Sequence, residues 1–301
     1  MIPIHVIDAF TDEAGKGNRA GVVLEADGLD EKTMQAAAAF AGFSETAFVM
    51  RGHSPDYDVH VRYFTPTKEV PICGHATIAT HFLRSANLNL PPGRLLAKTG
   101  AGILPVDIEG EGKDRRIVMT QGKPEFGPVL QGAQKAALLS ALKLSEDQVH
   151  ESLPIEIVST GHGKVIIPIR SQEVLDSLQP DMDALLKIGD ELKCPGYFVF
   201  CIEEDEDAPL RTYGRMFAPG IGIHEDPVTG NANGPAGAYL AHHGVLDFKD
   251  TTHYPGYQGI AMGKPGVVDV RLKRLPGGGL QVQVAGQAVE SGLLSFEEHL
   301  P

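Results

Sequence analysis

The sequence E-V-P-I-C-G-H-A-T at residues 69–77 returns in altered form as E-D-P-V-T-G-N-A-N at residues 225–233. The two stretches lie 156 positions apart and share Glu, Pro, Gly and Ala, with Val228 standing for Ile72. An upstream motif also repeats, at an offset of 153 positions, with Arg62, Phe64 and Pro66 matching Arg215, Phe217 and Pro219. Two copies of one structural unit account for both matches more simply than a chance likeness between loops rich in glycine and proline.

Each copy of the repeat reads as a strand, a loop containing proline, and an apolar segment led by glycine. We expect the apolar segments, residues 76–83 and 232–240, to form buried helices. Alternation of apolar and polar residues with period two predicts strands near residues 2–6 and 57–63. Between these strands, Asp30 is expected to cap a helix in the alanine-rich run that follows it. Strands and helices are therefore mixed along the chain.

Composition limits the partners that the protein can have. The chain of 301 residues has room for two domains, and its 39 acidic and 26 basic residues give a formal net charge of -13. This charge repels phosphate backbones and anionic lipids, so we expect neither nucleic acid nor a membrane as partner. No run approaches the roughly 18 apolar residues of a membrane-spanning helix. Three scattered cysteines and the lack of an apolar leader favour the cytoplasm.

The starts of the two repeated helices are candidate anion sites. A helix that follows a glycine-containing loop presents unpaired backbone N–H groups and the positive end of its dipole. We expect Gly74 to Ala76 and Gly230 to Ala232 to hold a substrate carboxylate, because the local field outweighs the net charge at contact distance. The alternative is that His75 and Asn231, at the second positions, only help to cap their helices.

Three side chains near these helix starts could perform acid–base chemistry. Glu45 precedes an apolar, strand-like run, where an unpaired carboxylate is costly; the alternative is that Ser44 and Glu45 are ordinary turn residues. His75 could relay or orient a proton. Asp226 comes just before the second helix and could hydrogen-bond such a histidine. Together these side chains would supply a base and an acid without a cofactor.

Six blocks of the chain, in this order, resemble the signature motifs of the PhzF family, the phenazine biosynthesis protein F-like isomerases. The blocks are I-D-A-F-T at 7–11, G-K-G-N-R-A-G-V-V-L at 15–24, S-E-T-A-F-V at 44–49, R-Y-F-T-P at 62–66, P-I-C-G-H-A-T at 71–77 and E-D-P-V-T-G-N-A at 225–232. The resemblance spans most of the chain. It implies a diaminopimelate-epimerase-like α+β fold with two pseudo-symmetric domains, each a curled, mostly antiparallel sheet wrapped around a central helix.

The same resemblance implies a domain plan and a reaction. The N-terminal domain would comprise residues 1–122, completed by residues 286–301, and the C-terminal domain residues 123–285. The weak periodicity around residues 120–129 is consistent with a crossing there. The family implies a homodimeric, cofactor-independent isomerase that moves a proton on a small carboxylate-bearing substrate in the cleft between the domains.

Single residues can be matched to the family's site. Glu45 falls on its proton-shuttling carboxylate, His75 on its cleft histidine and Asp226 on its cleft aspartate. Two positions depart from the pattern: Arg19 stands where proline is common, and Asn231 stands where members that process the phenazine precursor have serine. A larger amide at the start of the second helix changes volume and hydrogen bonding, so we expect a different small carboxylate as substrate.

Racemases of this superfold use one thiol from each half, just before the glycine that starts the helix. The matching positions here are Cys73 and Thr229, and threonine cannot replace a thiolate near neutral pH. Two alternatives to the isomerase stay open. One is a racemase or epimerase that uses Cys73 with a partner other than a thiol, and the other is a catalytically idle protein that binds carboxylates.

No metal or nucleotide site is expected from the spacing of the chain's residues. The 12 histidines include neither H-E-x-x-H nor a set paired with cysteines, and G-K-G-N at residues 15–18 lacks the spacing of a phosphate loop. The neighbours His242 and His243 at the end of the second helix are expected to interact with its last carbonyl groups.

Overall fold

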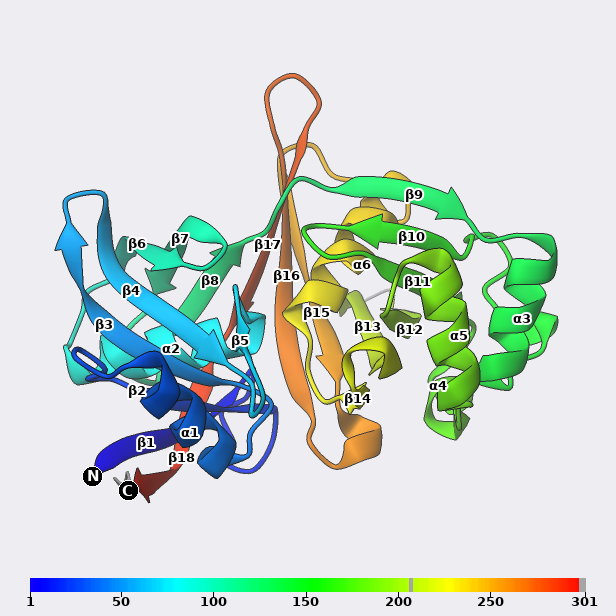
Figure 1. The fold of residues 1–301 in the computed structure, drawn as a ribbon. Coiled ribbons are helices and arrows are strands. Elements are labelled where there is room, and N and C mark those ends of the chain that lie inside the picture. Colours follow the sequence, from blue (N-terminus) through cyan, green and yellow to red (C-terminus); the bar gives the residue numbers. More distant parts are fainter. Residues whose placement is uncertain (206–207, 298–301) are drawn as a thin grey trace. The chain divides into compact units, whose positions relative to one another are not determined.

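The computed structural model describes residues 1–205 and 208–297. Its contacts divide the chain into two compact units, which we call unit 1 (Met1–Thr120 and the chain from Ala285 onward) and unit 2 (Gln121–Val284). Figure 1 shows mixed helices and curled strands in each of them, which confirms the predicted fold class. No helix among the described residues is long and apolar enough to cross a membrane.

Unit 1 is a curled sheet. Its strands are β1 (Ile2–Ala9), β2 (Asn18–Val23), β3 (Thr46–Ser54), β4 (Tyr57–Phe64), β5 (Glu69–Val70), β6 (Gly93–Thr99), β7 (Gly102–Glu109), β8 (Arg116–Thr120) and β18 (Ala288–Phe296). β1 pairs antiparallel with both β18 and β2, so strands from the two ends of the chain lie side by side. β2–β3 and β4–β6 are parallel pairs, whereas β3–β4, β4–β5, β6–β7 and β7–β8 are antiparallel.

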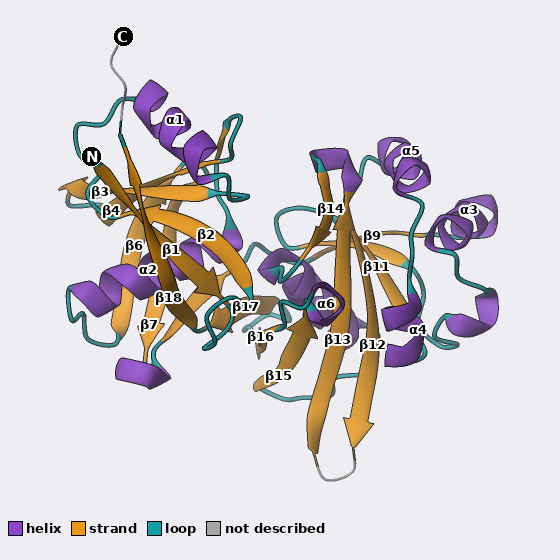
Figure 2. Ribbon diagram, turned by 90° about the horizontal axis from the view of Figure 1, so that it is seen from below, coloured by secondary structure: helices purple, strands orange, loops and turns teal. Residues whose placement is uncertain are grey.

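The helix α2 (Gly74–Asn87) lies within this curl and contacts strands from both edges of it, including β1, β2, β7, β8 and β18 (Figure 2). Ala76 and Ala79 are fully buried, and such small side chains let the strands approach the helix closely. The helix α1 (Glu31–Ala41) packs Met34 against the sheet in a separate apolar cluster. As predicted, Asp30 caps α1 by accepting a hydrogen bond from the Thr33 N–H.

Unit 2 repeats the plan of unit 1. Its strands are β9 (Glu125–Val129), β10 (Glu156–Ser159), β11 (Lys164–Ile169), β12 (Tyr197–Asp205), β13 (Ala208–Ala218), β14 (Ile223–Asp226), β15 (Thr251–Gln258), β16 (Gly266–Arg274) and β17 (Leu280–Gly286), which runs on past Val284. The parallel pairs β11–β12 and β13–β15 correspond to β2–β3 and β4–β6. The antiparallel pairs β12–β13, β13–β14 and β15–β16 correspond to β3–β4, β4–β5 and β6–β7.

The helix α6 (Gly230–His242) takes the place in unit 2 that α2 has in unit 1, and it contacts β10, β11 and β16. The Tyr239 ring of α6 meets the Phe200 ring of β12 edge to face at 6.2 Å. Three further helices, α3 (Gly132–Leu142), α4 (Gln172–Ser177) and α5 (Met182–Leu192), pack an apolar cluster onto the opposite face of β11 and β12. Short 3-10 turns occur at Gly112–Asp114, Glu146–Gln148, Pro219–Ile221 and Ile260–Met262.

The repeated sequence motif forms the same contact in both units. Arg62 on β4 makes two hydrogen bonds of 2.7 Å to the Glu69 carboxylate. Arg215 on β13 binds Glu225 in the same two-point manner, at 2.9 and 2.8 Å. Each guanidinium also lies 5.1 Å from the centroid of the aromatic ring two positions along the chain. The sequence repeat is therefore a repeat of side-chain structure as well.

Candidate active site

Glu45 directly precedes β3, as its place before an apolar run predicts. Its carbonyl oxygen accepts a hydrogen bond of 3.1 Å from the Gly21 N–H, which fixes the backbone against β2. The side chain is 15% exposed, and its Oε2 atom lies 3.4 Å from Nε2 of His75. That contact has the length of an ion pair but not hydrogen-bond geometry, so Oε2 is a buried acceptor with no hydrogen-bond partner among the described residues. Such an oxygen is well suited to take up a proton.

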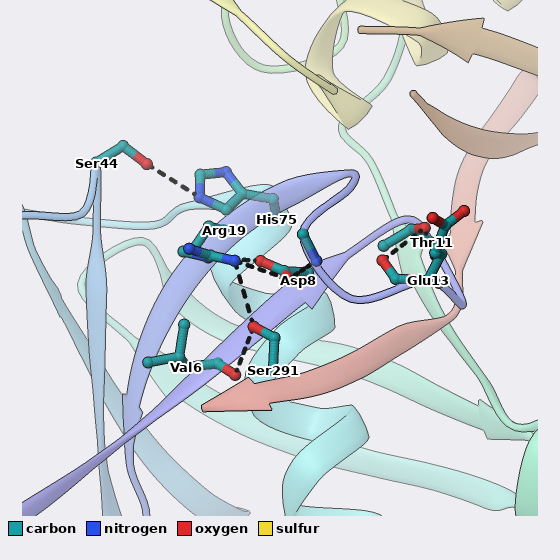
Figure 3. A network of polar contacts seen from close by, with 9 residues as sticks. Val6, Asp8, Thr11, Glu13, Arg19, Ser44, His75 and Ser291 are labelled. Atoms are coloured by element: carbon teal, nitrogen blue, oxygen red, sulfur yellow. Dashed lines mark hydrogen bonds and ion pairs between the residues drawn. The ribbon is translucent and has the colours of Figure 1, made fainter. Parts of the chain in front are cut away.

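His75 is the second residue of α2, and three side chains surround its ring. Besides Glu45, Ser44 Oγ lies 3.3 Å from Nε2, as Figure 3 shows, and Cys73 Sγ lies 3.4 Å from Nδ1. The His75 side chain is 8% exposed, so its imidazole is held in a restricted space. A carboxylate and an imidazole in contact can pass a proton between them, and a neighbouring hydroxyl can orient the ring.

The start of α2 is open to a ligand. Cys73 occupies the N-cap position, and no side-chain hydrogen bond caps the helix. A Cβ atom added at Gly74 would meet nothing within 4 Å, which shows that the space in front of this turn is open. The first N–H groups of α2, from Gly74 to Ala76, can therefore receive an anion beside the Glu45–His75 pair.

An ionic network supports the loop between β1 and β2, and Arg19 belongs to it (Figure 3). The Arg19 guanidinium donates to the Asp8 carboxylate at 2.7 and 3.1 Å, and the Gly15 N–H donates to the same group at 2.7 Å. Burial alone would raise the pKa of Asp8, but the hydrogen bonds from Arg19, Gly15 and Ser291 outweigh it and the pKa is lowered. The residue that departs from the family pattern thus holds a buried carboxylate in place.

Unit 2 carries a second polar network at the start of α6. Thr229 occupies the N-cap position, and its hydroxyl donates a short hydrogen bond to the Asp226 carboxylate. Gln258 donates at 2.8 Å to the Asp226 carbonyl and at 3.1 Å to the Thr229 hydroxyl. Its amide oxygen accepts from the Thr229 N–H and from Asn233 Nδ2, both at 3.0 Å. Asp226 is therefore held by Thr229, just before α6, and by Gln258, at the end of β15.

Asn231 turns its side chain onto the loop between β10 and β11. Its Nδ2 lies 3.4 Å from the His162 carbonyl oxygen, and its Oδ1 lies 3.4 Å from the Thr160 hydroxyl. Thr160 also donates at 2.7 Å to Gln121, whose Nε2 binds the Gly230 carbonyl at 3.1 Å. The backbone of Asn231 departs from helical geometry, so α6 bends within its first turn. No side-chain hydrogen bond caps α6, and the Ala232 N–H donates to the Thr229 carbonyl at 3.1 Å, so the N–H groups of Gly230 and Asn231 are the ones able to receive an anion.

The structure brings together two groups of the residues that the sequence singles out. Glu45, His75 and Gly74 meet in unit 1, and Asp226, Gly230 and Asn231 meet in unit 2. The hydrogen bond between Asp226 and His75 stays a prediction, because the two residues belong to different units. Sequence reasoning missed a further set of polar residues in unit 2, around the start of α6 and the loop that it contacts: Gln121, Thr160, Lys164 and Gln258.

Two clusters have donor atoms that could hold a metal ion. The ligand atoms of Glu45, Cys73 and His75 lie within 4.8 Å of one another, as do those of Glu156, His242 and His243. The second cluster corrects one expectation from the sequence. The His243 ring binds the buried Glu156 carboxylate at 2.8 Å, and the centroid of the His242 ring lies 4.1 Å from that of Phe126, on which it stacks. Both rings therefore contact side chains and not the carbonyl groups at the end of the helix.

Comparison with known proteins places this geometry in a family. The family model described as phenazine biosynthesis-like protein, PhzC-PhzF, matches residues 7–292. An uncharacterized isomerase of Clostridium acetobutylicum is 48% identical over 287 residues, 95% of each chain. The trans-2,3-dihydro-3-hydroxyanthranilate isomerase of Pseudomonas chlororaphis is 30% identical over 288 residues, which cover 95% of this chain and 96% of that one.

A solved structure agrees with these sequence matches. The phenazine biosynthesis protein of Bacillus anthracis, a PhzF family member, superimposes with a TM-score of 0.88 at 35% identity, covering 97% of this chain and 98% of that one. Glu45, His75 and Asp226 all lie within residues 7–292, which the family model matches. This chain therefore belongs to the PhzC-PhzF family of phenazine biosynthesis-like proteins, and it is an isomerase.

Proposed function

We propose that this isomerase moves a proton from one carbon of a small carboxylate-bearing substrate to another, with Glu45 as the group that carries the proton. The observation that supports this most directly is the buried Glu45 Oε2, 3.4 Å from His75 and without a hydrogen-bond partner among the described residues. A carboxylate in this state can take a proton beside an unsaturated or carbonyl-bearing carbon and return it elsewhere, which shifts a double bond. The reaction needs no cofactor.

Each of the other site residues has a proposed part. His75 contacts Glu45 and Ser44, and it relays or orients the proton. The uncapped first turns of α2 and α6 hold the substrate's carboxylate and the charge that develops next to it. Asp226, fixed by Thr229 and Gln258, serves the same substrate as the acid–base partner from unit 2.

The substrate that we propose is a small carboxylate other than the phenazine precursor. The relative named for trans-2,3-dihydro-3-hydroxyanthranilate is 30% identical to this chain. In this chain Asn231 turns a larger amide onto Thr160 and His162 at the start of α6. Volume and hydrogen-bond directions at that position select the substrate, so a change there alters which carboxylate fits.

The test is solvent exchange at carbon. Small carboxylates, trans-2,3-dihydro-3-hydroxyanthranilate among them, would be incubated with the enzyme in deuterated water and read by mass spectrometry. Wild type should introduce deuterium into its substrate, whereas Glu45→Gln, which keeps the shape and loses the base, should reduce incorporation by at least about 100-fold. Incorporation by Glu45→Gln at the wild-type rate would reject Glu45 as the proton carrier.

The same assay separates the two alternatives. Cys73 Sγ lies 3.4 Å from His75 Nδ1, the contact that a thiol-based racemase would use. Cys73→Ala should keep most of the exchange if Glu45 carries the proton and lose it if the thiol does. A protein that binds the carboxylates but catalyses no exchange with any of them would be an idle binder.

A further inference from the structure

Lys164 is a buried cation in unit 2 that the proposed chemistry does not use. It begins β11, a strand of otherwise apolar residues, and it is 8% exposed. Its aliphatic stem lies over Gly196, where an added Cβ atom would come within 2.7 Å of Lys164 Cδ. Any side chain at position 196 would therefore displace the lysine, and glycine gives the stem its room.

The registers of the two units show which residue of unit 2 corresponds to Glu45. Thr46 and Tyr197 hold the same place in the strand plan, because they lie opposite the repeated residues Phe64 and Phe217. One position earlier stand Glu45 in unit 1 and Gly196 in unit 2. Their carbonyls accept equivalent hydrogen bonds, from the Gly21 N–H at 3.1 Å and from the Val165 N–H at 2.9 Å.

Unit 2 therefore has no counterpart of the Glu45 carboxylate. The residue before Val165 is Lys164, whereas the residue before Gly21 is Ala20, which has no functional group. The lysine stem lies against the glycine that stands where unit 1 has its glutamate. In unit 2 a lysine stem thus lies against the position that corresponds to Glu45 in unit 1.

The ammonium group is linked to the start of α6 through the loop between β10 and β11. Lys164 Nζ donates to the His162 carbonyl at 3.4 Å and to the Gly163 carbonyl at 3.3 Å. The same His162 oxygen accepts from Asn231 Nδ2 at 3.4 Å, so one peptide oxygen joins the lysine to the second residue of α6. An ammonium has three N–H groups, and these two carbonyls account for two of them.

The charge of Lys164 has no counter-ion in contact. Within residues 1–205 and 208–297, no carboxylate oxygen lies within ion-pair distance of Nζ. Burial lowers the pKa of Lys164, and the more distant Cys194 and Asp226 oppose this effect by favouring the charged form. A buried, unpaired ammonium is destabilising, and such groups are retained where a ligand supplies the missing charge.

We infer that Lys164 is an anion-binding residue of this isomerase and that its remaining N–H, with the Asn231 amide and the first N–H groups of α6, binds a carboxylate of the substrate. The inference rests on the proposed function, because that function makes the bound carboxylate part of the substrate. Beyond the proposed function, the inference states that unit 2 recognises the substrate through the positive charge of Lys164. An analogue with an uncharged amide in place of the carboxylate is therefore rejected. The contribution of this contact to affinity can be measured by ligand binding alone, without turnover of a substrate.

The experiment uses succinate as the probe and its neutral analogue succinamide as the control. Backbone amide shifts of Gly230 and Asn231 would be followed by NMR as each compound is added to the full chain. Wild type should show saturable shifts with succinate and none with succinamide. Lys164→Met, which keeps the stem, should weaken succinate binding at least about 10-fold, and Lys164→Arg should restore most of it.

A further readout separates binding from structure. Lys164→Met should unfold at a higher temperature than wild type, because an unpaired buried charge is removed; a lysine needed only for folding would give a lower temperature. Equal binding by wild type and Lys164→Met would overturn the inference while leaving the deuterium test of Glu45 untouched, whereas exchange by Glu45→Gln at the wild-type rate would reject the proposed function and leave the binding result untouched.

Discussion

His81 lies in the middle of α2 with its ring 1% exposed. Neither ring nitrogen has a hydrogen-bond partner among the described residues. Burial lowers the pKa of His81 to about 3, and the nearby positive charge of Arg84 adds to the effect. The folded protein therefore holds this imidazole neutral at and well below neutral pH.

This state of His81 makes unit 1 sensitive to acid. The unfolded chain takes up a proton near pH 6.5 and the folded one only near 3, so the unfolded state binds more protons between these values and stability falls as the pH falls. Above pH 6.5 the contribution is fully present. For one group the limiting slope is about 1.4 kcal/mol per pH unit.

Replacing His81 by leucine should remove this dependence. Urea unfolding between pH 4 and 8 would give the free energy of unfolding of wild type and of His81→Leu. The difference between the two curves should be constant above pH 7 and should then change in favour of the variant as the pH is lowered, because leucine cannot be protonated. Parallel curves over the whole range would contradict the assignment.

At the scale of elements, the repeated ion pairs tie β4 to β5 and β13 to β14, but their surroundings differ. Arg215 and Glu225 are 11% and 16% exposed, whereas Arg62 and Glu69 are 21% and 36% exposed. Arg215 also donates to the carbonyls of Leu175 and Leu178 near the end of α4, both at 3.0 Å. Arg62 also contacts a helix, since it donates to the Glu31 carboxylate at the start of α1 at 2.8 Å, so the two pairs differ in burial rather than in joining a helix.

Removing the arginine of the repeated ion pair should lower the free energy of unfolding more in unit 2 than in unit 1. Arg215→Met leaves Glu225 unpaired in a largely buried place and should lower stability by about 3 kcal/mol, whereas Arg62→Met should cost about 1 kcal/mol. The urea midpoints of the two variants give the comparison. Adding Glu225→Gln to Arg215→Met should recover part of the loss, since the unpaired charge is removed. Equal losses in the two units would show that burial does not decide the strength of these pairs.

The helix starts illustrate what a sequence can and cannot reveal at this scale. Both helices were predictable because glycine and a dense apolar run follow each proline-containing loop. Glu45 was predictable as a polar residue at the head of an apolar strand, and the family resemblance then gave it a partner in His75. Lys164 carries the same signal, since it stands directly before the apolar run of β11.

What the sequence conceals is which distant residues meet. Gln258 and Thr229 are 29 positions apart, and Gln121 and Gly230 are 109 apart, yet each pair is hydrogen-bonded. No local pattern encodes such contacts, because they follow from the curvature of the sheet around α6. The same holds for Gly196, whose significance depends on the lysine stem that lies over it.

At the scale of the whole molecule, one chain builds the same plan twice, and the copies keep different residues at matching places. Cys73 and Thr229 start the helices, and Glu45 and Gly196 precede matching strands. The shared fold was predictable because the motif with arginine, proline and glycine survives in both copies. The difference between Cys73 and Thr229 is visible in the sequence repeat, whereas the one between Glu45 and Gly196 is not, because only the strand registers align those two positions.

The pairing of β1 with β18 predicts that unit 1 depends on the final strand more than unit 2 does. A chain that stops at Gln287 would leave the β1 edge without its antiparallel neighbour, which pairs with it from Ile2 to Ala9. Hydrogen–deuterium exchange measured by mass spectrometry should show faster exchange in β1, β2 and α2 and retained protection in β10 to β13. A uniform rise across both units would contradict this dependence.

The same pairing sets an order of events during synthesis. All of residues 121–284 are synthesised before β18, so the sequence of unit 2 is complete before that of unit 1. Unit 1 contains the first strand to be synthesised, yet its sheet needs β18, which is synthesised after every strand of unit 2. The half of the protein that carries Glu45 is thus the half whose sequence is completed last.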